Sequence, residues 1–226
     1  RQALRKLRRE NPCAKIIVTG CDAEINENFW LNENACDIVI KGSKKAEIDK
    51  ILLESSRPPS AKITDDKSVF TENAQALFPF KNRALVKIQE GCDNFCAYCI
   101  VPYARGKPRS RAFYEIIDEC KRLIDNSYTE IVLTGVNICR YYDNGKNLSE
   151  LIQKILSITP DFRLRLSSTE PDSQLYDIIG LMKENPHLCR FLHIPLQHGS
   201  EQILKAMRRQ HSTEDFANFA NFAVKN

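Results

Sequence analysis

The chain has 226 residues, of which 42% are hydrophobic, so it can bury a core and form one large domain or two smaller ones. Its net charge is only +4, which excludes a polycation and means that an anionic partner would meet a local basic patch. No apolar run reaches the roughly 18 residues of a membrane span, and the charged start RQALRKLRREN is unlike a signal peptide, so we expect a soluble cytoplasmic protein.

The first part of the chain alternates between helix and strand patterns. Helical periodicity or capping predicts helices at 1–11, 22–31 and 43–56, and short β-branched runs predict strands at 14–20 and 36–42. Such alternation is typical of a small α/β unit with parallel strands. We expect a further strand upstream of residue 1, so that residues 1–56 are part of a domain. Residues 57–82 lack a period and predict a linker.

From residue 83 to residue 226 the alternation returns. Strands are predicted at 84–91, 130–136, 162–168 and 191–196, each followed by a helix, at 113–126, 148–158, 173–185 and 200–209. A last helical pattern covers 214–226. Repeated strand–helix units indicate an α/β fold with a (βα) barrel. Because the chain stops inside a helical pattern, we expect an incomplete barrel and a longer intact protein.

Nine cysteines bear on the redox state of the protein. Their odd number, without a signal peptide, favours reduced thiols over a disulfide framework. A solitary reduced cysteine usually behaves as a small buried hydrophobic residue. We predict this role for Cys13, Cys36, Cys120, Cys139 and Cys189.

Three cysteines stand close together in the loop after the first predicted barrel strand. Cys92, Cys96 and Cys99 have C-x3-C-x2-C spacing, and α/β barrels place their active sites at the carboxyl ends of strands. Structural zinc usually takes four ligands in two pairs, and a ferredoxin run has a fourth cysteine before proline; the sequence has neither pattern. Three thiolates on a four-iron cluster would leave one iron open for catalysis. A zinc site remains the alternative.

With an aromatic residue before its last cysteine, this loop resembles that of the radical S-adenosylmethionine enzymes. The resemblance implies that Cys92, Cys96 and Cys99 each bind one iron of a 4Fe-4S cluster. The open iron would chelate S-adenosylmethionine, and one electron would then release a 5′-deoxyadenosyl radical. The resemblance also implies cofactor contacts from Tyr98 to the adenine and from three segments at strand ends: Thr134, Gly135, Ser168, Glu170, His193 and Gln197.

A second segment narrows the resemblance. NPCAKIIVTGCDAE is similar to the NP-x-AK-I-x-VTGC segment of methylthiotransferases. This similarity implies that Cys21 is a ligand of an auxiliary 4Fe-4S cluster, whose other ligands would lie upstream of residue 1. It further implies a C-terminal RNA-binding barrel beyond residue 226, an electron donor such as flavodoxin or ferredoxin, and the tRNA anticodon loop as a partner.

A basic run follows the three cysteines directly. Arg105, Lys107, Arg109 and Arg111 occupy four of seven positions, and no acidic residue lies between Asp93 and Tyr114. We expect these side chains to meet phosphates of an RNA loop, because recognition of RNA sequence usually falls on unpaired loop bases. A solvated surface loop is the alternative.

The same region favours one substrate class. VPYARGKPRSR resembles tRNA-modifying members rather than those that modify a ribosomal protein, and Ala104 with LTGVNICRY resembles the type acting on N6-threonylcarbamoyladenosine beside the anticodon. The expected reaction adds a methylthio group to C2 of that base. The alternatives are isopentenyladenosine in tRNA, a ribosomal protein, or a non-catalytic RNA-binding module stabilised by zinc.

Overall fold

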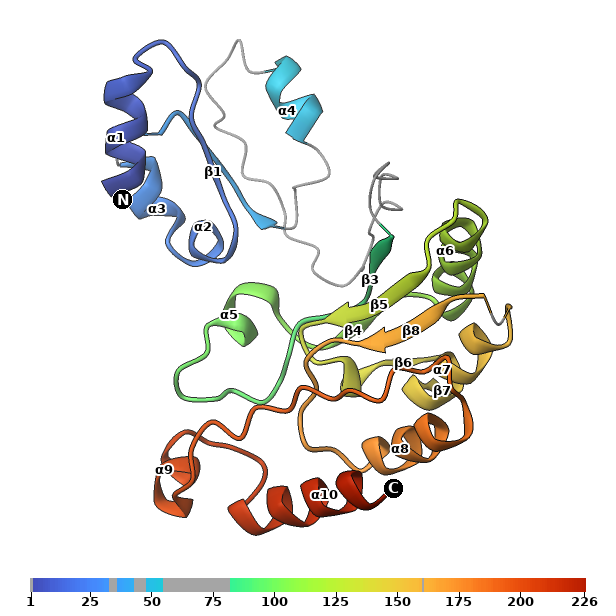
Figure 1. Ribbon diagram of the computed structural model, residues 1–226. Helices are drawn as coiled ribbons and strands as arrows, with labels where there is room; N and C mark the ends of the chain where they lie inside the picture. Colours follow the sequence, from blue (N-terminus) through green and yellow to red (C-terminus); the bar gives the residue numbers. More distant parts are fainter. Residues whose placement is uncertain (1, 33–35, 43–47, 55–81, 160) are drawn as a thin grey trace. The chain divides into compact units, whose positions relative to one another are not determined.

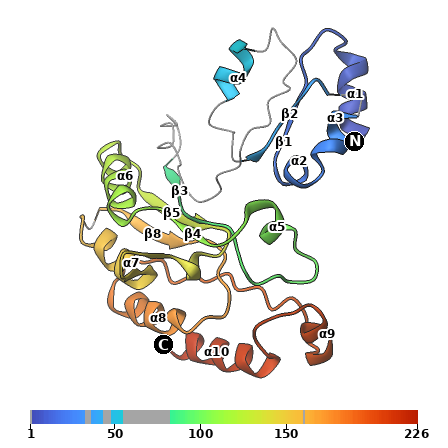
Figure 2. The same cartoon turned by 180° about the vertical axis from the view of Figure 1, so that it is seen from behind.

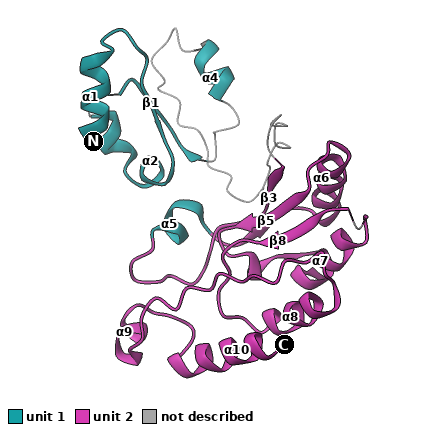
Figure 3. Ribbon diagram, viewed as in Figure 1, with its two compact units in different colours: residues 1–69, 100–106 teal, residues 70–99, 107–226 magenta. Residues whose placement is uncertain are grey.

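A computed structural model describes residues 2–32, 36–42, 48–54, 82–159 and 161–226 (Figure 1). The chain forms two compact units, residues 1–69 with 100–106 and residues 70–99 with 107–226 (Figure 3). Apart from its last residue, the predicted linker at 57–82 lies outside the described residues. The predicted domain boundaries therefore stay predictions.

The first unit contains two parallel strands, paired from Ile17 with Ile38 to Thr19 with Ile40. One predicted helix, at 22–31, is interrupted at Asn26, where φ is −111°. The Asn26 amide donates to Asp22 at 2.7 Å, which is the local side-chain bonding that makes asparagine a helix breaker. The elements of this unit are α1 (Gln2–Glu10), β1 (Ile17–Thr19), α2 (Cys21–Ile25), α3 (Glu27–Leu31), β2 (Ile38–Ile40), α4 (Ile48–Glu54) and α5 (Val101–Arg105).

The second unit is built on a sheet with strand order β4-β3-β5-β8. Strands β3 (Arg83–Glu90), β5 (Glu130–Gly135) and β8 (Arg163–Leu166) are parallel, and β4 (Arg109–Ser110) runs antiparallel to β3. Each parallel strand is followed by a helix: α6 (Phe113–Asp125), α7 (Leu148–Leu156) and α8 (Gln174–Glu184) (Figures 1 and 2). The predicted α/β class is confirmed, and the repeated units are those of a partial barrel.

The core of this unit lies between the sheet and its helices. Burial alternates in β8 and in the first part of β3, whereas β5 buries Ile131, Val132 and Leu133 in succession. The buried strand residues pack against the apolar faces of the helices. The asparagine before α7 forms a capping box with Glu150, which fixes where that helix begins. Fully buried members of the core include Val86, Ile88, Ile131, Leu133, Leu164, Ile116, Leu151 and Ile178.

The predicted strand at 191–196 does not form. This segment and the residues before it run beside β8 with only two isolated bridges, Leu164 to Leu188 and Ser168 to His193. The offsets of the two bridges differ by one residue, so an extra residue interrupts the ladder between them, and Pro195 offers no N–H. Two helices follow, α9 (Glu201–Ala206) and α10 (Thr213–Lys225).

Five short elements were not anticipated from the sequence. They are α5, β4, the 3-10 turn Ile138–Arg140, and the two strands of a hairpin, β6 (Tyr142–Asp143) and β7 (Lys146–Asn147). Among the residues that the structure describes, no helix is both long and apolar enough to cross a membrane.

Candidate functional site

The three-cysteine loop begins where β3 ends. Gly91 has a φ of 74°, which turns the chain out of the strand, and Phe95 has a φ of 48° in the middle of the loop. The Asn94 backbone N–H donates to the sulfur of Cys92 at 3.5 Å, and the Cys99 N–H donates to the carbonyl of Cys96 at 2.9 Å. The loop therefore has a defined turn rather than an extended course.

Gln89, the penultimate residue of β3, fixes the start of this loop. Its side chain is fully buried, and Nε2 donates to the carbonyls of Glu90 and Gly91 at 2.8 Å each. Its Oε1 accepts the backbone N–H of Asn137 at 2.7 Å. The Gln89 amide thus links the loop after β3 to the loop after β5. These two loops follow the carboxyl ends of neighbouring strands.

The thiols of the loop differ from the solitary cysteines. Cys92, Cys96 and Cys99 are half-buried and form no disulfide. Cys120 and Cys139 are buried, and burial raises the pKa of each to about 12, which suits an inert packing role. Cys189 is also buried as predicted. The same prediction was wrong for Cys13, which is exposed, and for Cys36, which is half-buried.

The three loop thiols are the kind of donor that an iron–sulfur cluster takes, and their assignment to such a cluster stays a prediction. Within the described ranges, no group of three His, Cys, Asp or Glu side chains is arranged to hold one ion. In a four-iron cluster each thiolate binds a different iron, so the sulfur atoms stand farther apart than the ligands of one ion. Burial raises the pKa of Cys92, and metal binding would have to displace that proton.

A buried arginine joins the loop to the end of β8. The Arg209 side chain is only 2% exposed and forms an ion pair with Glu170, one of the predicted cofactor contacts. Its Nη1 donates to the sulfur of Cys96 at 3.5 Å and to the hydroxyl of Tyr98 at 3.4 Å. The structure therefore brings two predicted cofactor residues and one predicted iron ligand around a single guanidinium.

The remaining predicted cofactor residues lie at or beyond strand ends. Thr134 and Gly135 close β5. The Ser168 hydroxyl lies 2.8 Å from Nδ1 of His193, a contact that joins two of the predicted segments. Gln197 is exposed and has a φ of 71°. Their contacts with a cofactor stay predictions.

The basic run divides into accessible and buried members. Lys107 is exposed and Arg109 half-buried. Arg111 is buried; its Nη1 donates to Glu119 at 2.6 Å and to the carbonyl of Lys87 at 3.1 Å. A guanidinium held in the core cannot meet a phosphate, so the assignment of Arg111 to an RNA surface is corrected.

Cys21, the predicted auxiliary ligand, lies in the first unit. It is the first residue of α2 and follows Gly20, whose φ of 110° ends the β1 segment. Nε of Arg105, on α5 of the same unit, donates to the Cys21 sulfur at 3.4 Å. Arg105 was predicted to meet RNA, and in the structure it contacts this thiol.

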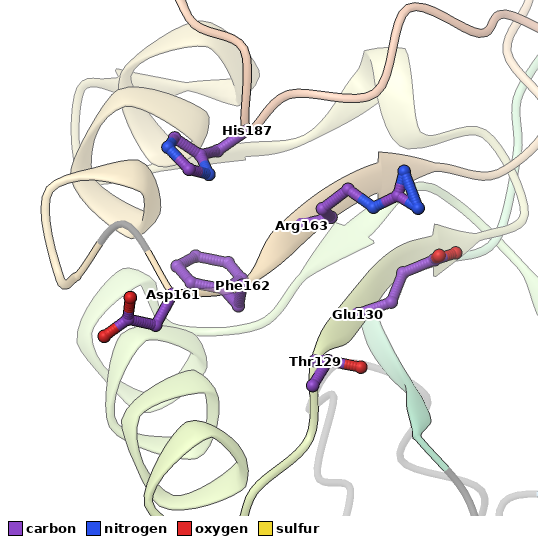
Figure 4. A pocket seen from close by; sticks show the side chains of 6 residues that line it. All are labelled: Thr129, Glu130, Asp161, Phe162, Arg163 and His187. Carbon is purple, nitrogen blue, oxygen red and sulfur yellow. The ribbon is translucent and has the colours of Figure 1, made fainter.

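A cavity of about 460 Å³ lies at the other end of the sheet (Figure 4). Five of its lining residues stand at or just before the first residues of β5 and β8, at the amino ends of these strands: Thr129, Glu130, Asp161, Phe162 and Arg163. The sixth, His187, follows α8, and its carbonyl accepts the N–H of Leu164 in β8. Barrel enzymes use the carboxyl ends for catalysis, and the cysteine loop follows the carboxyl end of β3. The cavity is therefore separate from the candidate site.

A model of the Radical SAM superfamily matches residues 86–226. The match contains the three-cysteine loop and covers more than half of the chain. The chain belongs to the radical SAM superfamily.

Curated relatives of this radical SAM chain carry two names. It is 36% identical over 217 residues to threonylcarbamoyladenosine tRNA methylthiotransferase MtaB of Chlamydia pneumoniae, a match of 96% of this chain and 49% of the relative. The enzyme of that name from Bacillus subtilis is 36% identical, over 98% and 51%. The tRNA-2-methylthio-N(6)-dimethylallyladenosine synthase of Chloroherpeton thalassium is 33% identical, over 95% and 49%. The chain spans about half the length of these relatives.

A solved structure supports the fold. The radical S-adenosylmethionine methyltransferase TsrM from Kitasatospora setae, with tryptophan substrate and a SAM analog bound, is similar with a TM-score of 0.62 at 15% identity. The similarity covers 99% of this chain and 50% of that chain. At this identity the likeness shows the radical SAM fold alone.

Two residues of the site were missed by sequence reasoning. Gln89 acts through three hydrogen bonds between its side-chain amide and backbone groups, and the spacing of residues in the sequence does not reveal such bonds. Arg209 stands at the end of the motif-like stretch HIPLQHGSEQILKAMRR, and a basic residue there was the available signal. Without a fold, nothing indicated that its side chain turns inward.

Proposed function

We propose that this chain is the central part of a tRNA methylthiotransferase that adds a methylthio group to C2 of N6-threonylcarbamoyladenosine beside the anticodon. The observation that carries this proposal is the match of 96–98% of the chain to enzymes named for that reaction. The site supports it, because three half-buried thiols follow the carboxyl end of β3, and α/β barrels place their active sites at the carboxyl ends of strands.

In this proposal Cys92, Cys96 and Cys99 hold a 4Fe-4S cluster. When bound, the cluster supplies the electron that cleaves S-adenosylmethionine to a 5′-deoxyadenosyl radical. The protein's own residues orient and shield the reactants: Gln89 sets the start of the loop, and Tyr98 and Glu170 border the cofactor. Cys21 is a ligand of the auxiliary cluster, which takes part in sulfur insertion.

The partners follow from the same proposal. Lys107 and Arg109 meet the phosphates of the tRNA anticodon loop, since they follow the cysteine loop and are not fully buried. A reduced flavodoxin or ferredoxin supplies electrons, and the reaction takes place in the cytoplasm.

A direct test uses the full-length protein under anaerobic conditions with a reductant, S-adenosylmethionine and substrate tRNA that lacks the methylthio group. Two tRNAs are compared, one with N6-threonylcarbamoyladenosine and one with isopentenyladenosine, and nucleosides are analysed by mass spectrometry. We expect the 2-methylthio product from the first tRNA. Product from neither tRNA, with about four irons present at the loop, would overturn the proposal.

A second candidate substrate is favoured by one observation. A relative named for the dimethylallyladenosine reaction is 33% identical over 95% of the chain, close to the value for the favoured type. In the two-tRNA experiment, methylthiolation of the isopentenyl substrate alone would establish this candidate. A colourless protein with one zinc would instead support a zinc-stabilised RNA-binding module.

Replacing single cysteines separates the two proposed clusters. Cys96→Ala should abolish formation of 5′-deoxyadenosine, because a thiolate ligand of the cluster is lost. Cys21→Ala should retain that cleavage and lose sulfur insertion. The matched control is Cys13→Ala, which removes an exposed thiol and should change neither activity. Near-normal cleavage by the Cys96→Ala protein would refute the ligand assignment.

A further inference from the structure

Arg209 is a buried cation placed against the cysteine loop. Its side chain is 2% exposed, while its partner Glu170 is 27% exposed, so the arginine is the deeper member of the pair. The same Nη1 that contacts Glu170 Oε1 at 3.3 Å also contacts Cys96 at 3.5 Å and Tyr98 at 3.4 Å. The Arg209 guanidinium therefore contacts one proposed iron ligand, Cys96, and two residues that are predicted to contact the cofactor, Tyr98 and Glu170.

The turn that follows α9 fixes the position of the Arg209 backbone. Helix α9 ends in a Schellman turn, in which the N–H of Arg208 donates to Lys205 at 3.0 Å and the N–H of Arg209 donates to Leu204 at 2.9 Å. Arg208 adopts the left-handed φ of 58° that this turn requires. The carbonyl of Met207, the C-cap residue of α9, accepts the N–H of Ala97 in the cysteine loop at 3.0 Å. The turn after α9 therefore contacts the cysteine loop twice, through the backbone of Met207 and through the side chain of Arg209.

The chemistry of these contacts points to a role in electron transfer. The reduction potential of an iron–sulfur cluster depends on net charge, on hydrogen bonds to its sulfurs and on exposure to solvent. An N–H donor and a positive charge both stabilise the more negative, reduced state. A fully structural ion pair would need neither the contact with Cys96 nor that with Tyr98.

We propose that Arg209 is a positioning residue that fixes Cys96 and Glu170 and raises the reduction potential of the radical cluster. The inference rests on the proposed function, because it needs a cluster on Cys92, Cys96 and Cys99. Beyond the proposed function, the inference assigns to Arg209, a residue outside the cysteine loop, an effect on the reduction potential of the cluster. Glu170 acts in the opposite direction, since its negative charge disfavours reduction.

The test is a redox titration of reconstituted full-length protein, followed by electron paramagnetic resonance. A Cys21→Ala background leaves only the cluster of the cysteine loop. Arg209→Gln should shift its midpoint potential to a more negative value, and Arg209→Lys should shift it less, because the charge is retained while the planar fork is lost. Arg208→Gln is the matched control: it removes an exposed charge one residue away and should leave the potential unchanged.

Two further measurements keep the outcomes distinct. Glu170→Gln retains the side-chain shape and should shift the potential to a more positive value, which tests the sign even if Arg209→Gln does not fold. Equal potentials in Arg209→Gln and Arg208→Gln, or an unchanged or more negative potential in Glu170→Gln, would overturn the inference. Failure of the unchanged loop to bind about four irons would instead count against the proposed function.

Discussion

At the scale of single residues, Gly135 shows how closely the carboxyl end of β5 packs against Gln89 of β3. A Cβ at this position would lie 2.8 Å from the carbonyl oxygen of Gln89 and 3.0 Å from Ile138. Because backbone must move to admit it, Gly135→Ala should lower the free energy of unfolding by about 1–3 kcal/mol. Denaturation in urea measures this loss. The control is Gly180→Ala on α8, where an added Cβ has nothing within 4 Å; equal effects of the two changes would contradict the packing interpretation.

Arg111 carries a second prediction at this scale. Arg111→Met would leave Glu119, whose side chain is 3% exposed, without its buried partner. The free energy of unfolding should fall by up to about 3–5 kcal/mol, because the buried Glu119 carboxylate loses its close partner, while its pair with Arg122 is longer, at 3.8 Å. Lys121→Met removes an exposed pair with Asp118 and should cost about 0–1 kcal/mol. Similar small losses in both variants would return Arg111 to the surface role predicted from sequence.

At the scale of elements, the turn after α9 is under backbone strain. Arg208 has a φ of 58°, a conformation that glycine adopts without cost. Arg208→Gly should therefore raise the free energy of unfolding by about 0.5–1 kcal/mol, the strain relieved exceeding the added chain entropy. Lys205→Gly, in the regular part of the same helix, should lower it by about 1 kcal/mol. A loss of stability in both variants would show that the left-handed residue is not strained.

The elements that were predicted from the sequence are long enough to show a regular spacing of apolar residues. Strand β3 and helices α6 and α7 follow from apolar spacing, and strand β5, which buries three residues in succession, follows from its β-branched apolar run. Two-residue strands such as β4 are too short to have a period. The segment at 191–196 has a strand composition, but its pairing is interrupted. The proposed cysteine ligands were visible as a spacing, whereas burial of the Arg111 and Arg209 side chains depends on partners distant in sequence.

At the scale of the whole molecule, the basic run predicts how tRNA binding responds to salt. Lys107→Gln or Arg109→Gln should each weaken binding and reduce the log–log salt slope by about 0.7, the value for one phosphate contact on single-stranded RNA. Lys183→Gln on α8 removes an exposed charge elsewhere and should leave the slope unchanged. Filter binding at several salt concentrations measures the slope. Equal slopes for all three variants would favour the solvated-loop alternative.

The separation of Cys96 and Arg209 along the chain has a consequence for biosynthesis. These two residues are 113 positions apart, and Tyr98 and Arg209 are 111 apart. At 5–20 residues per second, the ribosome takes on the order of ten seconds to reach the segment that holds the loop. During that interval the nascent chain carries three thiols whose final conformation is not yet enforced, and exposed thiolates are open to oxidation. Under the proposed function, the loop therefore gains its contacts with Arg209 only late in translation, and its thiols have to stay reduced until then.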